Sequence, residues 1–440
     1  MIDVPMLARR TALGTLLGLG LLSTACSGGG AAEDSTGDVV SELRSDMPRI
    51  MVDLSHAAGA GVSEQRFAVS FLQAQDAAQN LTFSPHSLST AFAMLSGAAE
   101  GQTLKDIEDV LEFGKVDEAF HRSQDALELS LEARNRDAIA APEQQVEAQI
   151  LRESNDIWVR ADVPPLPSYL DTLAQFYGVG VHQADFGQRP EEARQAINSK
   201  VSDDTHALIP ELIPGGVIDS DTVSVLTNAL YFKAPWAAAF DEPKPGDFHT
   251  LDGATTSVSL MRSRSTRTYY EGEGFVSVAV PYYGGDLEML LIVPDAGQFD
   301  RVRGALTSDT LTQVVSDRAS EFVDLTLPKF NLKSTVPAKQ VLASLGMVAP
   351  FDRAAAQLPG FPPGPYYNIY VSDVLHQATV AVDDKGTEAS AATAIVVAGT
   401  TSAAVDPPEP KVVTVDRPFL FVIRDNPTGS TLFIGQVVAP

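Results

Sequence analysis

The sequence predicts an α+β fold built as one large domain. Helix-period segments come first along the chain and strand-like segments later, without the strict strand–helix alternation of a parallel α/β sheet. From about residue 64 to residue 440 there is no second break in composition and no internal repeat. The length of 440 residues alone would allow two or three small domains, so the missing break favours a single one.

Four segments have the apolar spacing of helices. Residues 87–98 combine dense apolar character with small side chains, which is typical of a buried helix. Just before them, Ser84 can cap the helix and Pro85 suits its first turn. The other predicted helices cover residues 65–75, 103–112 and 191–202.

Runs rich in Val, Ile, Leu, Phe and Thr predict the strands. Turn signals separate them, such as Gly284-Gly285-Asp286 and the Asn426-Pro427 pair before Thr428-Gly429. The predicted strands cover residues 224–232, 275–282, 288–293, 322–327, 379–382, 412–415, 419–423 and 431–437.

The N-terminus has the pattern of an export signal. Arg9 and Arg10 precede an uncharged, mostly apolar run over 12–22, which is too short to span a bilayer comfortably. The small residues before Cys26 resemble the lipobox of bacterial lipoproteins, in which the cysteine carries the lipid. We therefore expect a signal peptide over 1–25 and membrane attachment through Cys26. An ordinary cleaved signal with an incidental cysteine, and hence an extracellular protein, is the alternative.

Residues 26–62 are rich in Gly, Ala, Ser and acidic residues, a composition typical of flexible linkers. We expect a tether over this range and the folded domain over 63–440.

Composition and motifs exclude several classes of function. Acidic residues outnumber basic ones by 57 to 31, which disfavours binding to nucleic acid or to an activating polyanion. A single cysteine excludes a disulfide framework and a zinc site built on several cysteines. The seven histidines show no metal-ligand spacing, and no nucleophile, phosphate-binding or dinucleotide motif is present. We therefore expect no metal, no cofactor and no enzymatic activity. A Ser/His/Asp triad whose members are far apart in the sequence is not excluded by spacing alone.

Residues 383–394 resemble the hinge of the serpins, the serine protease inhibitor family. The segments on either side of this hinge match that family in the order in which the family has them. They are 83–87, 93–98, 228–236, 372–378, 416–425 and 428–435. The resemblance implies the serpin fold, with helices packed on a large mixed sheet, smaller sheets and an exposed reactive-centre loop over about 384–411.

The resemblance also implies a mechanism of inhibition. A protease cleaves the loop and forms an acyl-enzyme, and the freed loop then inserts into the large sheet as a new strand. Alternate side chains of an inserted strand face inward, so Thr387 and every second residue after it must fit beneath the sheet. The leading inward residues are small and uncharged, as insertion requires. The hinge residues implied are Asp384, Gly386, Thr387, Ala389, Ala391 and Thr393.

Two further sites follow from the resemblance. The shutter, a polar cluster where the strands part, corresponds to Ser84, Ser87, Asn228 and His376. The breach, where the loop first enters the sheet, corresponds to Trp236 and Lys329, with Lys329 paired to Asp384.

The cleaved bond is placed by spacing. Counting fourteen residues on from Gly386, as the family implies, gives Thr400–Thr401. Counting back from the proline pair at 407–408 gives a bond near Ala404 instead. Both positions are small, and no Lys or Arg occurs from 386 to 410, so an elastase- or subtilisin-like target is expected.

We expect a monomeric, exported suicide inhibitor of serine proteases, with no catalytic residues of its own. Some members of the family trap cysteine proteases, so that class of partner stays open. A non-inhibitory relative that acts as a binding or scaffold protein is the alternative function.

Overall fold

The computed structural model describes residues 38–141, 144–362, 368–387 and 409–440. The predicted signal peptide, Cys26 and the first part of the tether lie outside these residues. So do Ala389, Ala391, Thr393, the Thr400–Thr401 bond and Ala404.

Helices and strands alternate irregularly along the described chain. The helices are α1 (Ala57–Gln73), α2 (Pro85–Ser96), α3 (Gly101–Val110), α4 (Glu118–Glu132), α5 (Pro167–Phe176), α6 (Pro190–Asp204), α7 (Phe299–Ala305), α8 (Ser308–Ser316) and α9 (Ala338–Ser344), with short 3₁₀ helices η1 (Leu54–His56) and η2 (Ala349–Phe351). The first strands are β1 (Val40–Leu43), β2 (Leu81–Phe83), β3 (Ile139–Ala141), β4 (Gln144–Val146), β5 (Ile150–Arg160), β6 (Val181–Ala184), β7 (Ser224–Pro235), β8 (Lys244–His249) and β9 (Thr255–Gly272). The remaining strands are β10 (Phe275–Pro281), β11 (Leu287–Pro294), β12 (Ala319–Pro328), β13 (Phe330–Val336), β14 (Asp373–Val382), β15 (Gly386–Thr387), β16 (Lys411–Thr414), β17 (Phe419–Asp425) and β18 (Thr431–Val437).

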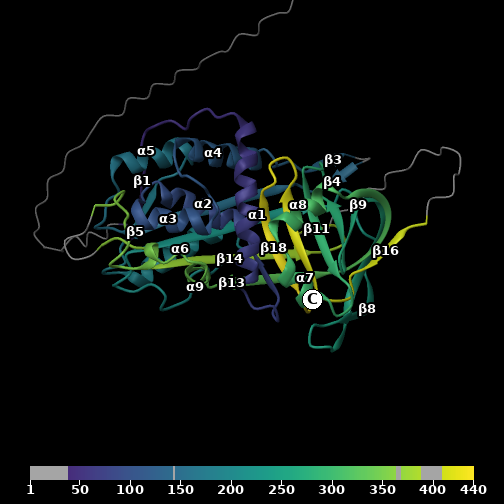
Figure 1. Ribbon diagram of the computed structural model, residues 1–440. Helices are drawn as coiled ribbons and strands as arrows, with labels where there is room; N and C mark the ends of the chain where they lie inside the picture. Colours follow the sequence, from purple (N-terminus) through teal and green to yellow (C-terminus); the bar gives the residue numbers. More distant parts are fainter. Residues whose placement is uncertain (1–37, 142–143, 363–367, 388–408) are drawn as a thin grey trace, which may run out of the picture. The chain divides into compact units, whose positions relative to one another are not determined.

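The strands form two large sheets and one small one. The first is mixed, in the order β1-β6-β5-β7-β15-β14-β13. In it, the first half of β14 pairs in parallel with the first half of β7. The second runs β16-β12-β9-β10-β11-β17-β18-β2, with β8 on β9, and β3 pairs with β4. Helices α2 to α5 lie along one side of the first sheet (Figure 1). The α+β prediction is confirmed.

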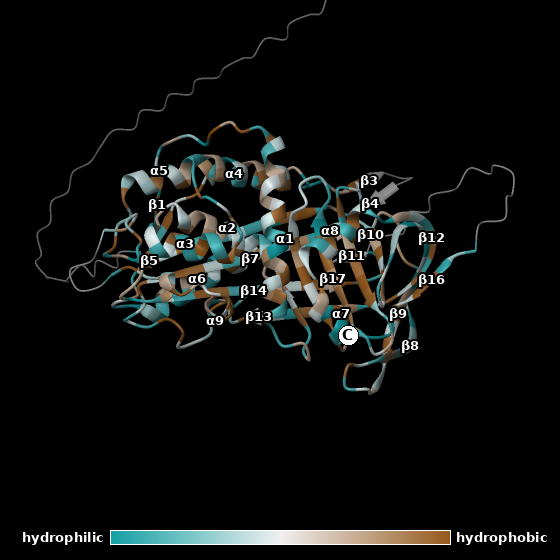
Figure 2. Ribbon diagram, in the orientation of Figure 1, coloured by the Kyte–Doolittle hydropathy of each residue, from teal (hydrophilic) through white to brown (hydrophobic). Residues whose placement is uncertain are grey.

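Strands β11, β17 and β18 and helix α2 lie in the core. Every residue of these three strands is buried, and hydrophobic colour concentrates on them in Figure 2. Every residue of α2 is buried too, as its dense apolar and small side chains predict. Ser84 caps this helix by accepting a hydrogen bond from the Ser87 amide (3.1 Å), and Pro85 occupies its first turn.

The prediction of a flexible tether up to residue 62 is wrong for residues 38–62. The N-terminal strap (residues 38–56) adds β1 to the edge of the mixed sheet, where it pairs with β6. Arg49 on the strap binds Asp125 (2.6 Å) and Glu128 (2.9 Å) of α4, and α1 begins at Ala57. These polar and backbone bonds order the strap, which contains no Gly or Ala although the predicted tether as a whole is rich in small residues. None of the described helices is long and apolar enough to cross a membrane.

Candidate functional site

The mixed sheet is divided at its centre, between β7 and β14. The two strands pair directly where Asp373–Gln377 runs beside Val225–Ala229. Farther along, β15 lies between them, with Gly386 opposite Pro235 and Thr387 opposite Ala234. Gly386 and Thr387 of the hinge are therefore already part of the sheet in the intact chain.

A tight turn at Asp383–Lys385 brings the chain from β14 into β15. The Asp383 carboxylate accepts hydrogen bonds from the amides of Lys385 (2.8 Å) and Gly386 (3.1 Å). A Cβ atom on Gly386 would lie 2.2 Å from the carbonyl oxygen of Ala234. Only glycine fits here, because the loop backbone passes so close to β7.

The breach residues hold this turn through backbone and side-chain hydrogen bonds. The amide of Trp236 donates to the carbonyl of Lys385 (2.8 Å), and its indole Nε1 donates to the carbonyl of Asp383 (2.9 Å). Lys329 contacts Asp384 as expected, with Nζ 2.8 Å from Oδ1. That ion pair is partly exposed to solvent and contributes little to stability, so Trp236 is the stronger of the two anchors.

Thr387 points inward and meets a residue that sequence reasoning missed. Its Oγ1 lies 2.6 Å from the hydroxyl of Tyr282, and both side chains are fully buried. Trp236 stacks on the Tyr282 ring with the centroids 4.5 Å apart. Burial raises the pKa of Tyr282, so its hydroxyl stays protonated. The pocket beneath the sheet thus accepts a small hydroxyl side chain at the first inward position.

The shutter residues lie where β7 and β14 still pair. His376 stands opposite Asn228 across these strands, and Asn155 of β5 stands opposite Asn228 on the other side. The Ser84 amide donates to Nε2 of His376 (3.0 Å). Burial lowers the pKa of His376 to about 3, so the ring is neutral, as an Nε2 acceptor requires.

Several shutter atoms make no hydrogen bond to the described part of the chain. They are Nδ1 of His376, both side-chain polar atoms of Asn228 and Oγ of Ser87. These donors and acceptors are therefore available for new hydrogen bonds. The described residues hold no cluster of three or more His, Cys, Asp or Glu side chains able to bind a metal ion.

Comparisons with known proteins identify the family of this arrangement. The family model described as "Serpin (serine protease inhibitor)" matches residues 63–440. An uncharacterized serpin-like protein of Thermococcus kodakarensis is 32% identical over 363 residues, covering 82% of this chain and 81% of the relative. Leukocyte elastase inhibitor A of Mus musculus is 30% identical and covers 82% of this chain and 93% of its own. The crystal structure of the thermophilic serpin tengpin in the native state matches with a TM-score of 0.77 and 25% identity, over 90% of this chain and 98% of that chain.

The close fit at Gly386 predicts that Gly386→Ala releases the hinge from the sheet. The added methyl group meets backbone atoms that cannot move, which costs about 1–3 kcal/mol. Trypsin should then cleave after Lys385 faster than in the unmodified protein, because cleavage tracks the open population. Gly59→Ala in α1, where a Cβ atom meets nothing within 4 Å, is the control and should leave the rate unchanged. Equal cleavage rates in all three proteins would contradict the insertion of β15.

Proposed function

Because the chain belongs to the serpin family, we propose that it inhibits its target protease as a suicide substrate. The protease serine attacks the carbonyl carbon of Thr400, the bond to the nitrogen of Thr401 breaks, and the new amine leaves with a proton. The ester left on Thr400 would normally be hydrolysed by water. Insertion of the freed loop into the mixed sheet carries the attached protease away and prevents this step.

The insertion of Gly386 and Thr387 between β7 and β14 carries this proposal. The new strand already has its first residues in register, and the strands that it would separate are paired beyond it. The next inward positions are Ala389, Ala391 and Thr393, which are small and uncharged. Extension of β15 therefore needs no bulky or charged side chain to pass beneath the sheet.

The loop sequence supports a protease that prefers small residues. Thr400 and the alternative near Ala404 both suit an elastase- or subtilisin-like pocket, and an Arg- or Lys-directed protease finds no basic residue from 386 to 410. One relative carries the name leukocyte elastase inhibitor A. We take the target to be a serine protease of this preference.

The lipobox-like sequence before Cys26 supports an inhibitor held at a membrane of the cell envelope. We expect Cys26→Ser to move the protein from the membrane fraction to the soluble fraction in the cell that produces it. Metabolic labelling with a fatty acid measures the modification directly. A protein that is soluble and unlabelled before the substitution would instead indicate an ordinary cleaved signal.

Incubation with elastase- and subtilisin-like proteases should give a covalent adduct that survives SDS. The released C-terminal peptide should begin at Thr401 when its mass is measured, because the acyl bond forms on Thr400. A peptide that begins near 405 would move the bond to the alternative site. Clean cleavage without an adduct for every protease would overturn inhibition and favour the binding or scaffold function.

Thr387→Arg should convert the inhibitor into a substrate. Thr387 is 1% exposed beneath the sheet, and an unpaired cation buried there would oppose insertion of the cleaved loop. The number of inhibitor molecules consumed per protease should rise several-fold. Glu388→Arg places the same charge at the adjacent, outward position and is the matched control. An unchanged adduct yield for Thr387→Arg would contradict the insertion mechanism.

A further inference from the structure

A buried histidine in the first turn of α2 joins two carboxylates from different parts of the fold. Nδ1 of His86 lies 2.6 Å from Oε1 of Glu64 on α1, and Nε2 lies 2.6 Å from Oε1 of Glu153 on β5. Only 2% of the His86 side chain is exposed. Burial opposes a charge on the ring, but the two carboxylates outweigh it and raise the pKa of His86 well above its usual value. Both ring nitrogens therefore donate, as in an imidazolium ion.

The Glu64 end of this cluster is fixed to the body of the protein. Its Oε2 accepts hydrogen bonds from the Ser430 hydroxyl (2.5 Å) and the Thr431 amide (3.2 Å), at the turn between β17 and β18. The Glu153 end belongs to β5, which pairs with β7 from Ile150 to Val159. His86 therefore links the body to the β5–β7 side of the mixed sheet.

The other side of the sheet is fastened to the same short segment by hydrogen bonds from backbone amides to side chains. The Thr82 amide donates to Ser334 of β13 (2.9 Å), and the Ser84 amide donates to His376 of β14. Strand β2, which leads into α2, also packs on both β13 and β14. If β15 grows longer, β7 must move away from β14, and β5 moves with β7. The link from His86 to Glu153 then has to lengthen.

We infer that Glu64, His86 and Glu153 form a clamp that holds the sheet closed until the loop is cleaved. His86 and Glu153 are its positioning residues, which slow premature entry of the loop. This inference rests on the proposed function, because it concerns the same insertion. Neutral hydrogen bonds between Asn135 and Leu151 also tie the start of β5 to the segment that follows α4. The clamp is the charged link and therefore the stronger one.

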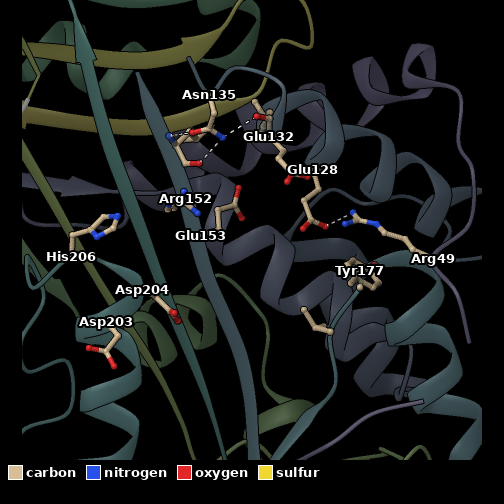
Figure 3. Close-up of a pocket in the computed structure, with 14 residues that line it drawn as sticks. Arg49, Glu128, Glu132, Asn135, Arg152, Glu153, Tyr177, Asp203, Asp204 and His206 are labelled. Carbon is tan, nitrogen blue, oxygen red and sulfur yellow. Dashed lines mark hydrogen bonds and ion pairs between the residues drawn. The ribbon is translucent and has the colours of Figure 1, made fainter. Parts of the chain in front are cut away.

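The clamp opens at its Glu153 end. Glu153 is 16% exposed, against 2% for Glu64, and lines a pocket of about 480 Å³. Figure 3 shows Glu153 on β5 and Glu128 on α4 beside this pocket, with Arg49 bound to Glu128. Water in the pocket can solvate the Glu153 carboxylate once it leaves His86, whereas Glu64 has no such access.

Glu153→Gln tests the clamp in the full-length protein, because it removes the charge and keeps an oxygen acceptor. A synthetic peptide of residues 387–399 serves as the inserting strand, and native gels measure its rate of incorporation. We expect incorporation about tenfold faster than in the unmodified protein, as a charge-assisted hydrogen bond becomes neutral. Glu132→Gln, which removes a carboxylate from the same pocket, is the matched control and should leave the rate unchanged.

The pH dependence separates a clamp from a general loss of stability. The pKa of His86 is raised in the folded protein, so the clamp stabilises the closed sheet fully below the pKa of about 6.5 that histidine has in an unfolded chain. This stabilisation is lost as the pH rises through the pKa of His86 in the folded protein. Incorporation should therefore speed up in the unmodified protein as the pH rises through the raised pKa of His86, and it should change less in Glu153→Gln. The groups that face His86 are Glu64 on α1, Glu153 on β5 and Glu128 on α4. Burial, Glu153 and Asp125 raise the pKa of Glu128 to about 7 against Arg49, so the rates are compared above neutral pH, beyond the titration of Glu128.

Each outcome decides one proposal. Equal rates for Glu153→Gln and the unmodified protein, or equal pH dependence, would overturn the clamp and leave the inhibitor function intact. Failure of the peptide to enter any variant would overturn the insertion mechanism itself and the clamp with it. The variant His86→Gln, provided that it folds, gives a second measurement of the same rate. It should accelerate peptide incorporation at least as much as Glu153→Gln.

Discussion

The pairing of β7 with β14 is the constraint on which the rest of the site depends. It is complete over Asp373–Gln377 and is replaced at the far end by the two residues of β15. The sheet is therefore closed at one end and already divided at the other. The shutter lies at the closed end, the breach at the divided end, and the link from α2 to β5 beside them. Each of these groups acts on the boundary between the same two strands.

The interactions at the divided end mostly involve backbone groups of the turn, and this suits the loop movement that we propose. Trp236 binds the turn through two carbonyl groups, and Asp383 satisfies two amides of the same turn. Such bonds can be exchanged for those of a longer strand without leaving a buried polar group unpaired. The loop side chain that enters the pocket beneath the sheet is the small Thr387, which is hydrogen-bonded to the Tyr282 hydroxyl.

Local signals predicted part of this arrangement. The cap at Ser84, the buried character of α2 and most core strands follow from short sequence patterns, and family resemblance predicted the Lys329–Asp384 contact. Tyr282 was missed because its partner Thr387 is 105 residues away. Strands β5 and β9 carry too many polar residues for a clear alternating pattern. The strap was assigned to the tether because residues 26–62 as a whole are rich in small and acidic residues, although residues 38–56 contain no Gly or Ala. Its partners lie on β6 and α4, far away in the sequence.

The two buried histidines near the first turn of α2 show that hydrogen-bond partners, and not burial alone, decide whether the ring is charged. His376 has one amide donor on Nε2 and no carboxylate, so burial keeps it neutral. His86 has a carboxylate on each nitrogen and carries a charge at the same depth. A neutral histidine suits a row of polar side chains that exchange hydrogen bonds. A charged histidine between two carboxylates suits a link that is strong while it is dry and is released once water from the adjoining pocket reaches Glu153.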